Sequence, residues 1–316
     1  MRDQTGRRIR YLRLSVTDAC NLRCRYCAPA DISSVARDDL LTREELTQIA
    51  EAGIKVGLDK IRLTGGEPLM RPDIAAVTAQ IAALPGLREL AMTTNGMLLG
   101  TYAQTLQRQG LNRVNISLDT LNAKKFKAFT RGGRLDHVLG GLSVAEAVGL
   151  TPIKLNVVLI GGENDDEIAD FVALTEHRPI NVRFIELMPL GESAHWPESR
   201  FIPVDRVLEA CPTLEPATGE GAGVARIYQL PGAVGKVGLI SPMSRGFCNS
   251  CDRVRITADG KLKPCLHSDE EIPLRGLRGP ALEEALRAGI AAKPREHSLE
   301  PGRPSESGRN MNQIGG

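Results

Sequence analysis

The sequence contains no long hydrophobic run, and this absence argues against a membrane-spanning helix. Its most apolar stretch, residues 150–160, is interrupted by Pro152 and Lys154 and is much shorter than the roughly 20 residues that cross a bilayer. The formal net charge is only +2 for 316 residues, too little for the broad basic surface of a nucleic-acid-binding protein. We therefore expect no membrane and no nucleic acid as a partner, and positive charge that serves an anionic ligand must be local.

The sequence also lacks the features of a secreted, disulfide-bonded protein. Residues 1–5 contain no apolar signal region, the seven cysteines are an odd number, and the chain is much longer than a disulfide scaffold. We expect a cytoplasmic protein with reduced thiols, and Cys211, which follows an apolar stretch, should be buried and inert. Hydrophobic residues make up 42% of the chain, enough for a sizeable core in one large or two modest domains.

Three cysteines share one short loop, Cys20-x-x-x-Cys24-x-x-Cys27, directly after the β-rich residues 11–17. Soft thiolates with no His, Asp or Glu at ligand spacing favour an iron–sulfur cluster or zinc over harder metals. A structural site closes with four ligands, whereas three leave one position open for a small molecule. The loop therefore predicts a [4Fe–4S] cluster with one open iron. A zinc site that takes its fourth ligand from elsewhere is the alternative.

A second triad lies near the other end of the chain and consists of Cys248, Cys251 and Cys265. By the same argument it predicts a second cluster with an open iron. His267 keeps a structural Cys3His zinc site as an alternative for this triad.

Thirteen residues separate the last two cysteines of this triad, and a β-hairpin would bring the two cysteines together. Residues 253–264 form two alternating runs around an Asp-Gly turn, which predicts a β-hairpin. With a two-residue turn, Ala258 pairs with Lys261, and Cys265 lies opposite Val254. Cysteines that are distant in sequence would then form a compact triad.

Short β-rich runs alternate with helix-length amphipathic segments, which is typical of βα units around a parallel sheet. We expect strands at residues 11–17, 60–64, 89–94, 113–118, 153–159 and 181–187. We expect helices at residues 42–56, 72–84, 101–109, 135–148 and 165–177. The first helix would begin with a capping box formed by Thr42 and Glu45. Six units predict an α/β fold with an incomplete TIM-like (βα)6 barrel.

The regular alternation stops near residue 200, which suggests three parts. Residues 1–199 would form the partial barrel, and residues 200–293 a mixed α/β segment that carries the second cluster. Residues 294–316 are rich in Gly, Pro, Ser and charge, so we expect an extended tail.

The predicted barrel strands carry polar side chains at alternate positions, where a closed barrel would have branched apolar ones. These positions hold Arg13, Ser15, Arg62, Thr64, Asn115, Ser117, Lys154, Asn156 and Arg183. A parallel sheet lined by helices leaves few exposed faces for such residues, although exposed edge or antiparallel strands are the alternative. We expect a wet, cationic cavity that suits a polyphosphate.

The second strand continues directly into Gly65-Gly66-Glu67-Pro68. Paired glycines let a ligand approach the backbone closely, and Glu67 places an acceptor at the carboxyl end of the strand, where barrels carry their chemistry. A purely structural strand-to-helix turn is the alternative for this tetrapeptide.

Together these motifs resemble a known family. The first cysteine loop combined with Gly65-Gly66-Glu67-Pro68 is similar to radical S-adenosylmethionine (SAM) enzymes. The second triad, the following Arg253-x-Arg255 and the terminal Gly315-Gly316 resemble the GTP 3′,8-cyclase (MoaA) family of molybdenum cofactor biosynthesis. The resemblance covers residues 8–316 and implies a lyase that converts GTP to (8S)-3′,8-cyclo-7,8-dihydroguanosine 5′-triphosphate.

The resemblance also implies roles for individual residues. Each cysteine triad would hold a [4Fe–4S] cluster, with SAM on the open iron of the first and guanine on that of the second. SAM would contact Tyr26, Gly66, Glu67, Ser117 and Met188. GTP would contact Arg13, Arg62, Thr93, Lys154, Arg183, Arg253 and Arg255. The residues expected to act in catalysis are Arg253, Arg255, Gly315 and Gly316. A 5′-deoxyadenosyl radical would take hydrogen from C3′ of GTP, and the resulting carbon radical would attack C8. A further electron and a proton would complete the cyclised dihydro product.

Three positions depart from the family pattern. Ala19 replaces an arginine, Ala28 a methionine, and Asp252 an asparagine. These changes alter the electrostatics around the clusters and remove no ligand.

The family implies a homodimer, a low-potential electron donor and a downstream cyclic pyranopterin monophosphate synthase as partners. Two other functions stay open. A radical SAM peptide-modifying enzyme with an auxiliary cluster is disfavoured because such proteins usually carry more additional cysteines. A zinc-stabilised binding protein would leave the cationic strands unexplained.

Overall fold

The computed structural model describes residues 1–31, 35–217, 223–300 and 303–315, and its centre is one twelve-stranded sheet. The strands are β1 (Tyr11–Ser15), β2 (Lys60–Thr64), β3 (Glu89–Thr94), β4 (Arg113–Ser117), β5 (Ile153–Leu159), β6 (Ile180–Glu186), β7 (Glu215–Pro216), β8 (Arg226–Gln229), β9 (Lys236–Ile240), β10 (Arg253–Ile256), β11 (Lys261–Lys263) and β12 (Ile272–Pro273). The helices are α1 (Arg43–Lys55), α2 (Ile74–Ala82), α3 (Leu99–Arg108), α4 (Ala123–Thr130), α5 (Leu135–Ala147), α6 (Ile168–Ala173), α7 (Arg206–Ala210), α8 (Gly279–Ala291) and α9 (Met311–Ile314).

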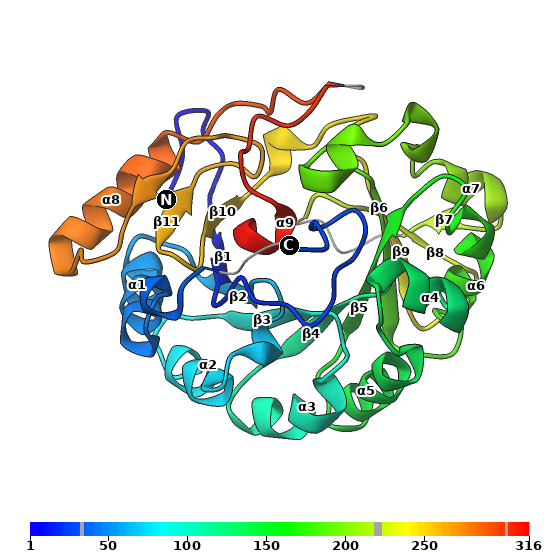
Figure 1. Cartoon of the computed structure of the whole chain (residues 1–316), viewed down its shortest axis with the longest axis horizontal. Helices are drawn as coiled ribbons and strands as arrows, with labels where there is room; N and C mark the ends of the chain where they lie inside the picture. The colour runs from blue at the N-terminus through cyan, green and yellow to red at the C-terminus, as the bar shows by residue number, and fades with distance from the viewer. Residues whose placement is uncertain (32–34, 218–222, 301–302, 316) are drawn as a thin grey trace.

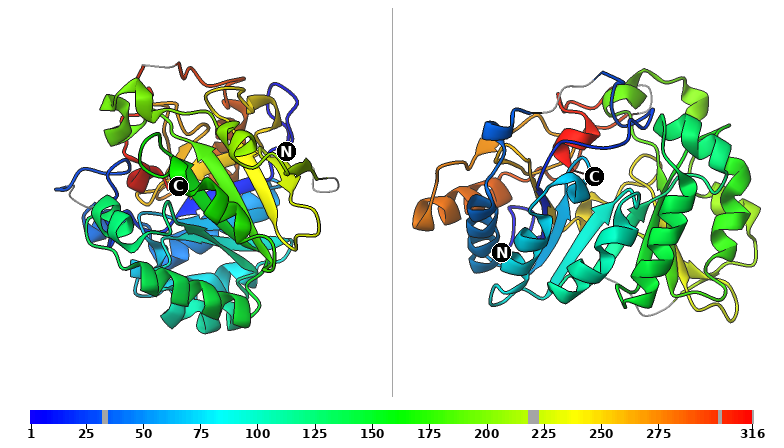
Figure 2. Two further views of the ribbon diagram at one scale, coloured as in Figure 1. Left: turned by 90° about the vertical axis from the view of Figure 1, so that its right-hand side faces the viewer. Right: turned by 60° about the horizontal axis from the view of Figure 1, so that its bottom comes forward.

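The sheet is an open barrel. Strands β1 to β6 are parallel neighbours in chain order, and the strand order of the whole sheet is β12-β11-β10-β1-β2-β3-β4-β5-β6-β9-β8-β7. Figure 1 shows these strands curving around a central space, with α1, α2, α3 and α5 on the outside. The two further views in Figure 2 show the same layering of helices over the outer face of the sheet. The prediction of an α/β fold with an incomplete TIM-like barrel is therefore confirmed.

The C-terminal region extends this sheet at both ends. Strand β10 lies parallel to β1 and β9 parallel to β6, so residues beyond 200 flank the six predicted strands on both sides. The remaining strands, β11, β12, β8 and β7, continue outward in antiparallel pairs. The sequence did not predict this flanking, because pairing between distant strands leaves no local pattern.

Alternation along each strand separates the two faces of the sheet. The outward positions of β1, β2 and β4 are fully buried aliphatic residues that pack against the helices, namely Leu12, Leu14, Ile61, Leu63, Val114 and Ile116. Burying side chains of this size stabilises the fold by roughly 1.5–3 kcal/mol each. The inward positions are thereby left to the polar residues that line the barrel interior.

The predicted boundaries of α1 and α5 agree with the structure to within one residue at each end. Thr42 and Glu45 form the expected capping box at the start of α1. The expected helix over residues 165–177 is shorter, because Asp165–Glu167 forms a 3-10 turn and α6 ends at Ala173. Helices α4, α7, α8 and α9 were not predicted, and α9 lies in the tail that was expected to be extended. The side chain of Asn122 caps α4 by accepting from two backbone N–H groups.

The hairpin after the second triad forms with a register one residue from the predicted one. Arg255 pairs with Lys263, and the N–H of Thr257 donates to the carbonyl oxygen of Lys261. The connection therefore has three residues, Ala258 to Gly260. Gly260 has φ 81°, and a glycine with a positive φ is common at the last position of three-residue hairpin loops. Continuing this register sets Cys265 opposite Arg253, so the predicted Val254 partner was wrong.

The tail ends inside the barrel. Figure 1 shows α9 at the centre of the ring of strands, and Ile314 is fully buried there.

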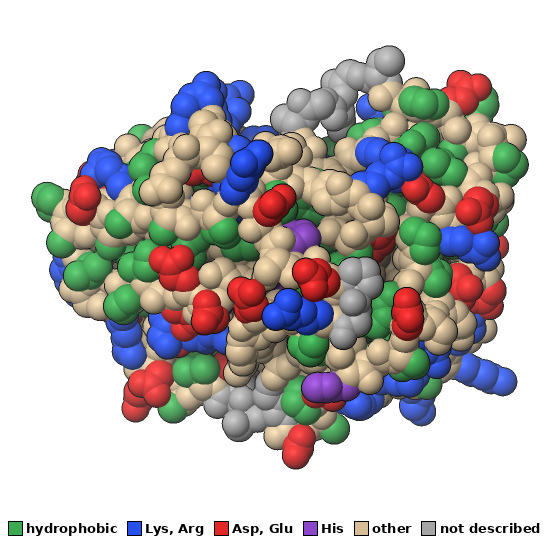
Figure 3. All heavy atoms as spheres, turned by 90° about the horizontal axis from the view of Figure 1, so that it is seen from above, with side chains coloured by type: hydrophobic (Ala, Val, Ile, Leu, Met, Phe, Trp, Pro, Cys, Tyr) green, Lys and Arg blue, Asp and Glu red, His purple; other side chains and the backbone are tan. Residues whose placement is uncertain are grey.

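Figure 3 views the molecule from above, where Lys and Arg side chains are interspersed with Asp and Glu on the visible face. None of the helices in the described ranges is long and apolar enough to span a bilayer.

Candidate active site

A cavity of about 840 Å³ occupies the barrel interior, and all six cysteines of the two triads line it. This volume lies in the upper part of the range for small-molecule sites. A cavity is therefore present where the sequence predicted one, and both triads line it.

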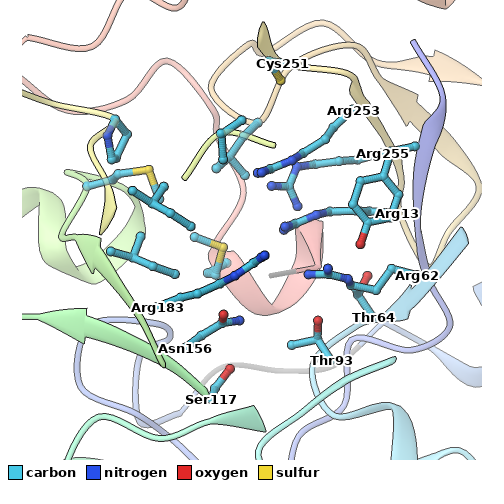
Figure 4. A pocket seen from close by; sticks show the side chains of 18 of the residues that line it. Arg13, Arg62, Thr64, Thr93, Ser117, Asn156, Arg183, Cys251, Arg253 and Arg255 are labelled. Atoms are coloured by element: carbon cyan, nitrogen blue, oxygen red, sulfur yellow. The ribbon is translucent and has the colours of Figure 1, made fainter. Parts of the chain in front are cut away.

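Arginine side chains from both walls converge in this cavity. The strand register sets Arg255 and Arg62 on either side of Arg13. Figure 4 shows Arg253 on the same side of the cavity as these three arginines. Arg183 lies on the opposite side and points toward them. Thr93, Ser117, Lys154 and Asn156 line the same space, whereas Ser15 and Asn115 are buried beneath it. Alternation along separate strands thus brings the predicted GTP-contacting residues together.

The positive charges of these side chains repel one another. Burial, reinforced by neighbouring positive charges, lowers the pKa of Arg62, Arg183 and Arg255 to about 10 and that of Lys154 to about 7. The Nε atoms of Arg13, Arg62 and Arg253 are buried and have no hydrogen-bond partner among the described residues. Because buried donors without acceptors are costly, a polyanion that paired with them would be strongly favoured.

One pair in the cavity was missed by the sequence analysis. Arg113 donates to Glu89 at 2.5 Å and to Asn115 at 2.6 Å, and both charged residues line the cavity. Period-two alternation places Arg113 on the same face as Asn115 and Ser117, so the signal was available. Glu89 neutralises Arg113, which sets this arginine apart from those with unpaired nitrogens.

The first cysteine loop lies at the carboxyl end of β1. Tyr26, Gly66, Ser117 and Met188, the expected SAM contacts, line the cavity together with its cysteines. The Tyr26 hydroxyl donates to Asp119 at 3.2 Å, an acceptor that the sequence analysis did not single out. Burial raises the pKa of the Cys27 thiol to about 12, so an iron or zinc ion must displace its proton on binding.

Gly65 and Gly66 allow two loops to approach closely. The N–H of Gly66 donates to the carbonyl oxygen of Thr17 at 2.8 Å. A Cβ on Gly65 would lie 2.2 Å from that same oxygen, and one on Gly66 would lie 2.4 Å from the carbonyl oxygens of Asp18 and Ala19. These glycines were predicted to admit a ligand, and in the structure the backbone that approaches them is that of residues 17–19, directly before the first cysteine.

Replacing Gly66 by alanine should therefore displace the loop that carries Cys20. Two backbone oxygens cannot move aside as a flexible side chain can, so we expect a loss of roughly 1–3 kcal/mol in unfolding free energy, measured by urea titration. Gly140→Ala, at a helix position with nothing within 4 Å of the new Cβ, is the control and should not destabilise. Equal stability of the two variants would contradict this explanation.

Glu67 is fully buried and holds neighbouring backbone. Its carboxylate accepts from the N–H groups of Leu69 at 3.0 Å and Asn95 at 2.6 Å and from the Thr94 hydroxyl at 2.8 Å, and burial raises its pKa to about 7. The Asn95 amide in turn lies 3.8 Å from the sulfur of Cys20. Glu67 is not among the residues that line the cavity, so the structure gives it a supporting position, and direct contact with SAM stays a prediction.

The second triad is tied to the first strand of the barrel. The carbonyl oxygen of Asp252 accepts from the N–H groups of Arg10 and Tyr11, and Arg7 donates to the carbonyl oxygen of Cys248 at 2.8 Å. His267, the fourth ligand of the zinc alternative, instead lies 3.1 Å from the Ser305 hydroxyl through its Nδ1. These contacts fix the second triad beside Arg253 and Arg255.

Each triad offers three free thiols to the cavity, and this is the donor type that holds an iron–sulfur cluster. Cys211 lies apart in the core, as expected.

The tail brings Gly315 against Arg255 and Thr64, two residues that line the cavity. The carbonyl oxygen of Gly315 accepts a hydrogen bond from Arg255, and a Cβ at this position would lie 2.3 Å from Oγ1 of Thr64. Gly316, the other predicted tail residue, lies outside the described residues.

Comparison with known proteins identifies the family of this chain. Residues 14–175 match the family model described as Radical SAM superfamily, and residues 180–299 match Molybdenum Cofactor Synthesis C. A GTP 3′,8-cyclase of Alkaliphilus oremlandii (strain OhILAs) is 50% identical, with the alignment covering 100% of both chains. Another, from Peptoclostridium acidaminophilum, is 53% identical and covers 99% of this chain and 98% of its own.

A solved structure agrees at the level of the fold. SuiB of Streptococcus suis bound to S-adenosylmethionine superposes with a TM-score of 0.61 over 90% of this chain and 68% of that chain. At 14% sequence identity, this similarity shows the fold alone. The two family models and the full-length relatives, in contrast, show that the chain belongs to the GTP 3′,8-cyclase family of radical SAM enzymes.

Proposed function

We propose that this protein converts GTP to (8S)-3′,8-cyclo-7,8-dihydroguanosine 5′-triphosphate in molybdenum cofactor biosynthesis, using SAM and two [4Fe–4S] clusters. The observation that carries the proposal is one cavity lined by two cysteine triads and by the converging cations of β1, β2, β6 and β10. A peptide-modifying radical SAM enzyme would not need such a concentration of positive charge. The full-length relatives named GTP 3′,8-cyclase support the same choice.

The first triad and its neighbours form the SAM half of the proposed site. Cys20, Cys24 and Cys27 would each bind one iron, while Tyr26, Gly66, Ser117 and Met188 would surround SAM. When bound, the reduced cluster supplies the electron that cleaves SAM to methionine and the 5′-deoxyadenosyl radical that abstracts hydrogen from GTP. The protein would orient the ribose toward SAM and exclude water from the reactive species.

The cationic wall forms the GTP half. Arg13, Arg62, Lys154 and Arg183 would bind the triphosphate, with Thr93 as a hydroxyl partner. Arg253 and Arg255 would hold the nucleotide beside the second triad, where the guanine reaches the open iron. Pairing the buried guanidinium groups with phosphate oxygens would relieve their mutual repulsion, and Lys154 would regain its proton on binding because its pKa rises beside an anion.

We further propose that three successive segments of the chain have different roles. Residues 1–199 would supply the SAM site, residues 200–293 the second cluster, and residues 294–316 the tail that reaches the substrate. The free cysteines are consistent with a reducing compartment such as the cytoplasm. A homodimer, a low-potential electron donor and a cyclic pyranopterin monophosphate synthase that consumes the product complete the proposal.

Anaerobic incubation of the reduced, reconstituted protein with SAM and GTP tests this function. Mass analysis should detect 5′-deoxyadenosine and a cyclised nucleotide, and the nucleotide should be absent when either substrate is omitted. SAM cleavage that GTP does not stimulate, without a cyclised nucleotide, would contradict the proposed substrate.

Replacing Arg255 or Arg253 by alanine should weaken GTP binding or cyclisation by roughly tenfold or more, because a charge-assisted contact contributes about 1.5–3 kcal/mol. SAM cleavage should survive better than product formation. Calorimetric titration with GTP and product analysis measure both effects, and the exposed Arg108→Ala is the control. An equal loss of SAM binding would argue that these arginines serve the fold or the first triad instead.

A further inference from the structure

The C-terminal tail connects the surroundings of both triads. The side-chain amide of Asn312 donates to the carbonyl oxygen of Asp18 at 3.2 Å, close to the first cysteine of the first triad. Three residues later, the carbonyl oxygen of Gly315 accepts from Arg255 on β10. The end of the tail therefore lies between the two halves of the proposed site, and its position depends on what holds the segment that precedes it.

That segment is held by Arg309. Its guanidinium group donates to both carboxylate oxygens of Asp259, at 3.1 and 2.9 Å. It also donates to both carboxylate oxygens of Glu271, at 2.5 and 2.9 Å. Asp259 lies in the turn between β10 and β11, and Glu271 lies immediately before β12, so both carboxylates belong to the sheet extension that carries the second triad.

The environment of these pairs makes them stronger than ordinary surface ion pairs. The three side chains are only 17–19% exposed, so water screens them weakly. Bidentate arginine–carboxylate pairs also fix orientation, because both donors must match both acceptors. Arg309 thereby sets the direction in which the chain enters α9.

We propose that Arg309 is a positioning residue that anchors the tail to the β10–β12 hairpins and so places Gly315 beside Arg255. This inference rests on the proposed function, because its consequence is for cyclisation of GTP. The one-turn helix α9 is too short to be stable by itself, so its location in the barrel must come from tertiary contacts. Arg309 precedes it by two residues and is the charged anchor closest to it in sequence.

Removing Arg309 should release the tail without unfolding the hairpins. Lys261 lies 3.1 Å from Glu271, and Lys263 lies 3.6 Å from the same carboxylate. Lys261 also lies 3.8 Å from Asp259, so both carboxylates keep a positive neighbour in an Arg309→Ala variant. The consequences should therefore appear mainly in the tail and in the fate of the substrate, with the hairpins still folded.

Two measurements on the full-length, cluster-loaded protein test the proposal. Hydrogen exchange of residues 303–315 without GTP should be about tenfold or more faster in Arg309→Ala. With SAM and GTP, the ratio of cyclised nucleotide to 5′-deoxyadenosine should fall by about tenfold or more. Arg309→Lys keeps the charge but loses the bidentate geometry, so it should restore both values in part.

Arg303→Ala is the matched control from the same tail. Its side chain is 71% exposed and, among the described residues, makes a single charged contact, 3.6 Å from Glu300, so the variant should resemble the wild type in both measurements. If Arg309→Ala does not fold, the double variant Asp259→Asn/Glu271→Gln removes the charged partners from the other side and should give the same two results.

The outcomes separate this proposal from the function on which it rests. Unchanged exchange in the tail would overturn the anchor, and faster exchange with an unchanged product ratio would overturn its role in positioning. If the wild type cleaves SAM but forms no cyclised nucleotide, the proposed function fails, while the exchange measurement still decides whether Arg309 anchors the tail.

Discussion

Replacing Cys20 by alanine should abolish the formation of 5′-deoxyadenosine while leaving the second triad able to hold a cluster. The wild type should contain about eight irons as two [4Fe–4S] clusters, and the variant about four. Cys20 is the thiol that the Asn95 amide approaches, and its loop is fixed to Gly66 and Glu67, so no described cysteine is placed to substitute for it. Anaerobic iron and sulfide analysis together with product chromatography would measure both effects.

Cys211→Ala is the natural control for this experiment. Cys211 is a free cysteine that lies in the aliphatic core, away from the cavity. Its replacement should leave both the iron content and SAM cleavage at wild-type levels. Two zinc ions per chain without labile sulfide would contradict the cluster assignment of both triads.

Replacing Gly315 by alanine should have the second large effect, a loss of product with little change in stability. Gly315 has φ 85°, a conformation that costs other L-residues roughly 1–2 kcal/mol, and a Cβ would lie 2.3 Å from Oγ1 of Thr64. The population with an inserted tail should therefore fall by about tenfold or more. Product formation should fall accordingly, while both clusters and SAM binding persist. Deleting Gly315 and Gly316 together should have the same outcome.

The same tail offers a control at Gly308. A Cβ there would have nothing within 4 Å, and its backbone does not require a positive φ. Gly308→Ala should therefore turn over like the wild type. Wild-type product formation by Gly315→Ala would show that the end of the tail takes no part in the reaction, and would leave the cluster assignments intact.

Local pattern in the sequence determined the six central strands, the hairpin of β10 and β11 and the triads, whereas β7, β8, β9 and β12 were not predicted. Alternation by two residues placed Arg13 and Arg62 on the inner face of their strands, because adjacent side chains of a strand must point to opposite sides. The capping box of Thr42 and Glu45 was equally readable, since both partners lie within one turn. The spacing of Cys20, Cys24 and Cys27 indicated an open cluster site from the number of ligands alone.

Only the tertiary structure decided which distant segments meet. The pairing of β10 with β1 brings Arg255 beside Arg13, and the insertion of α9 brings Gly315 beside Arg255; neither leaves a periodic signal in the chain. The reason for Gly65 and Gly66 also depended on the loop that lies against them. The alternation of residue types predicts which face of a strand a side chain lies on. Which strands are neighbours depends on contacts between segments that are far apart in the sequence, and such contacts leave no local pattern.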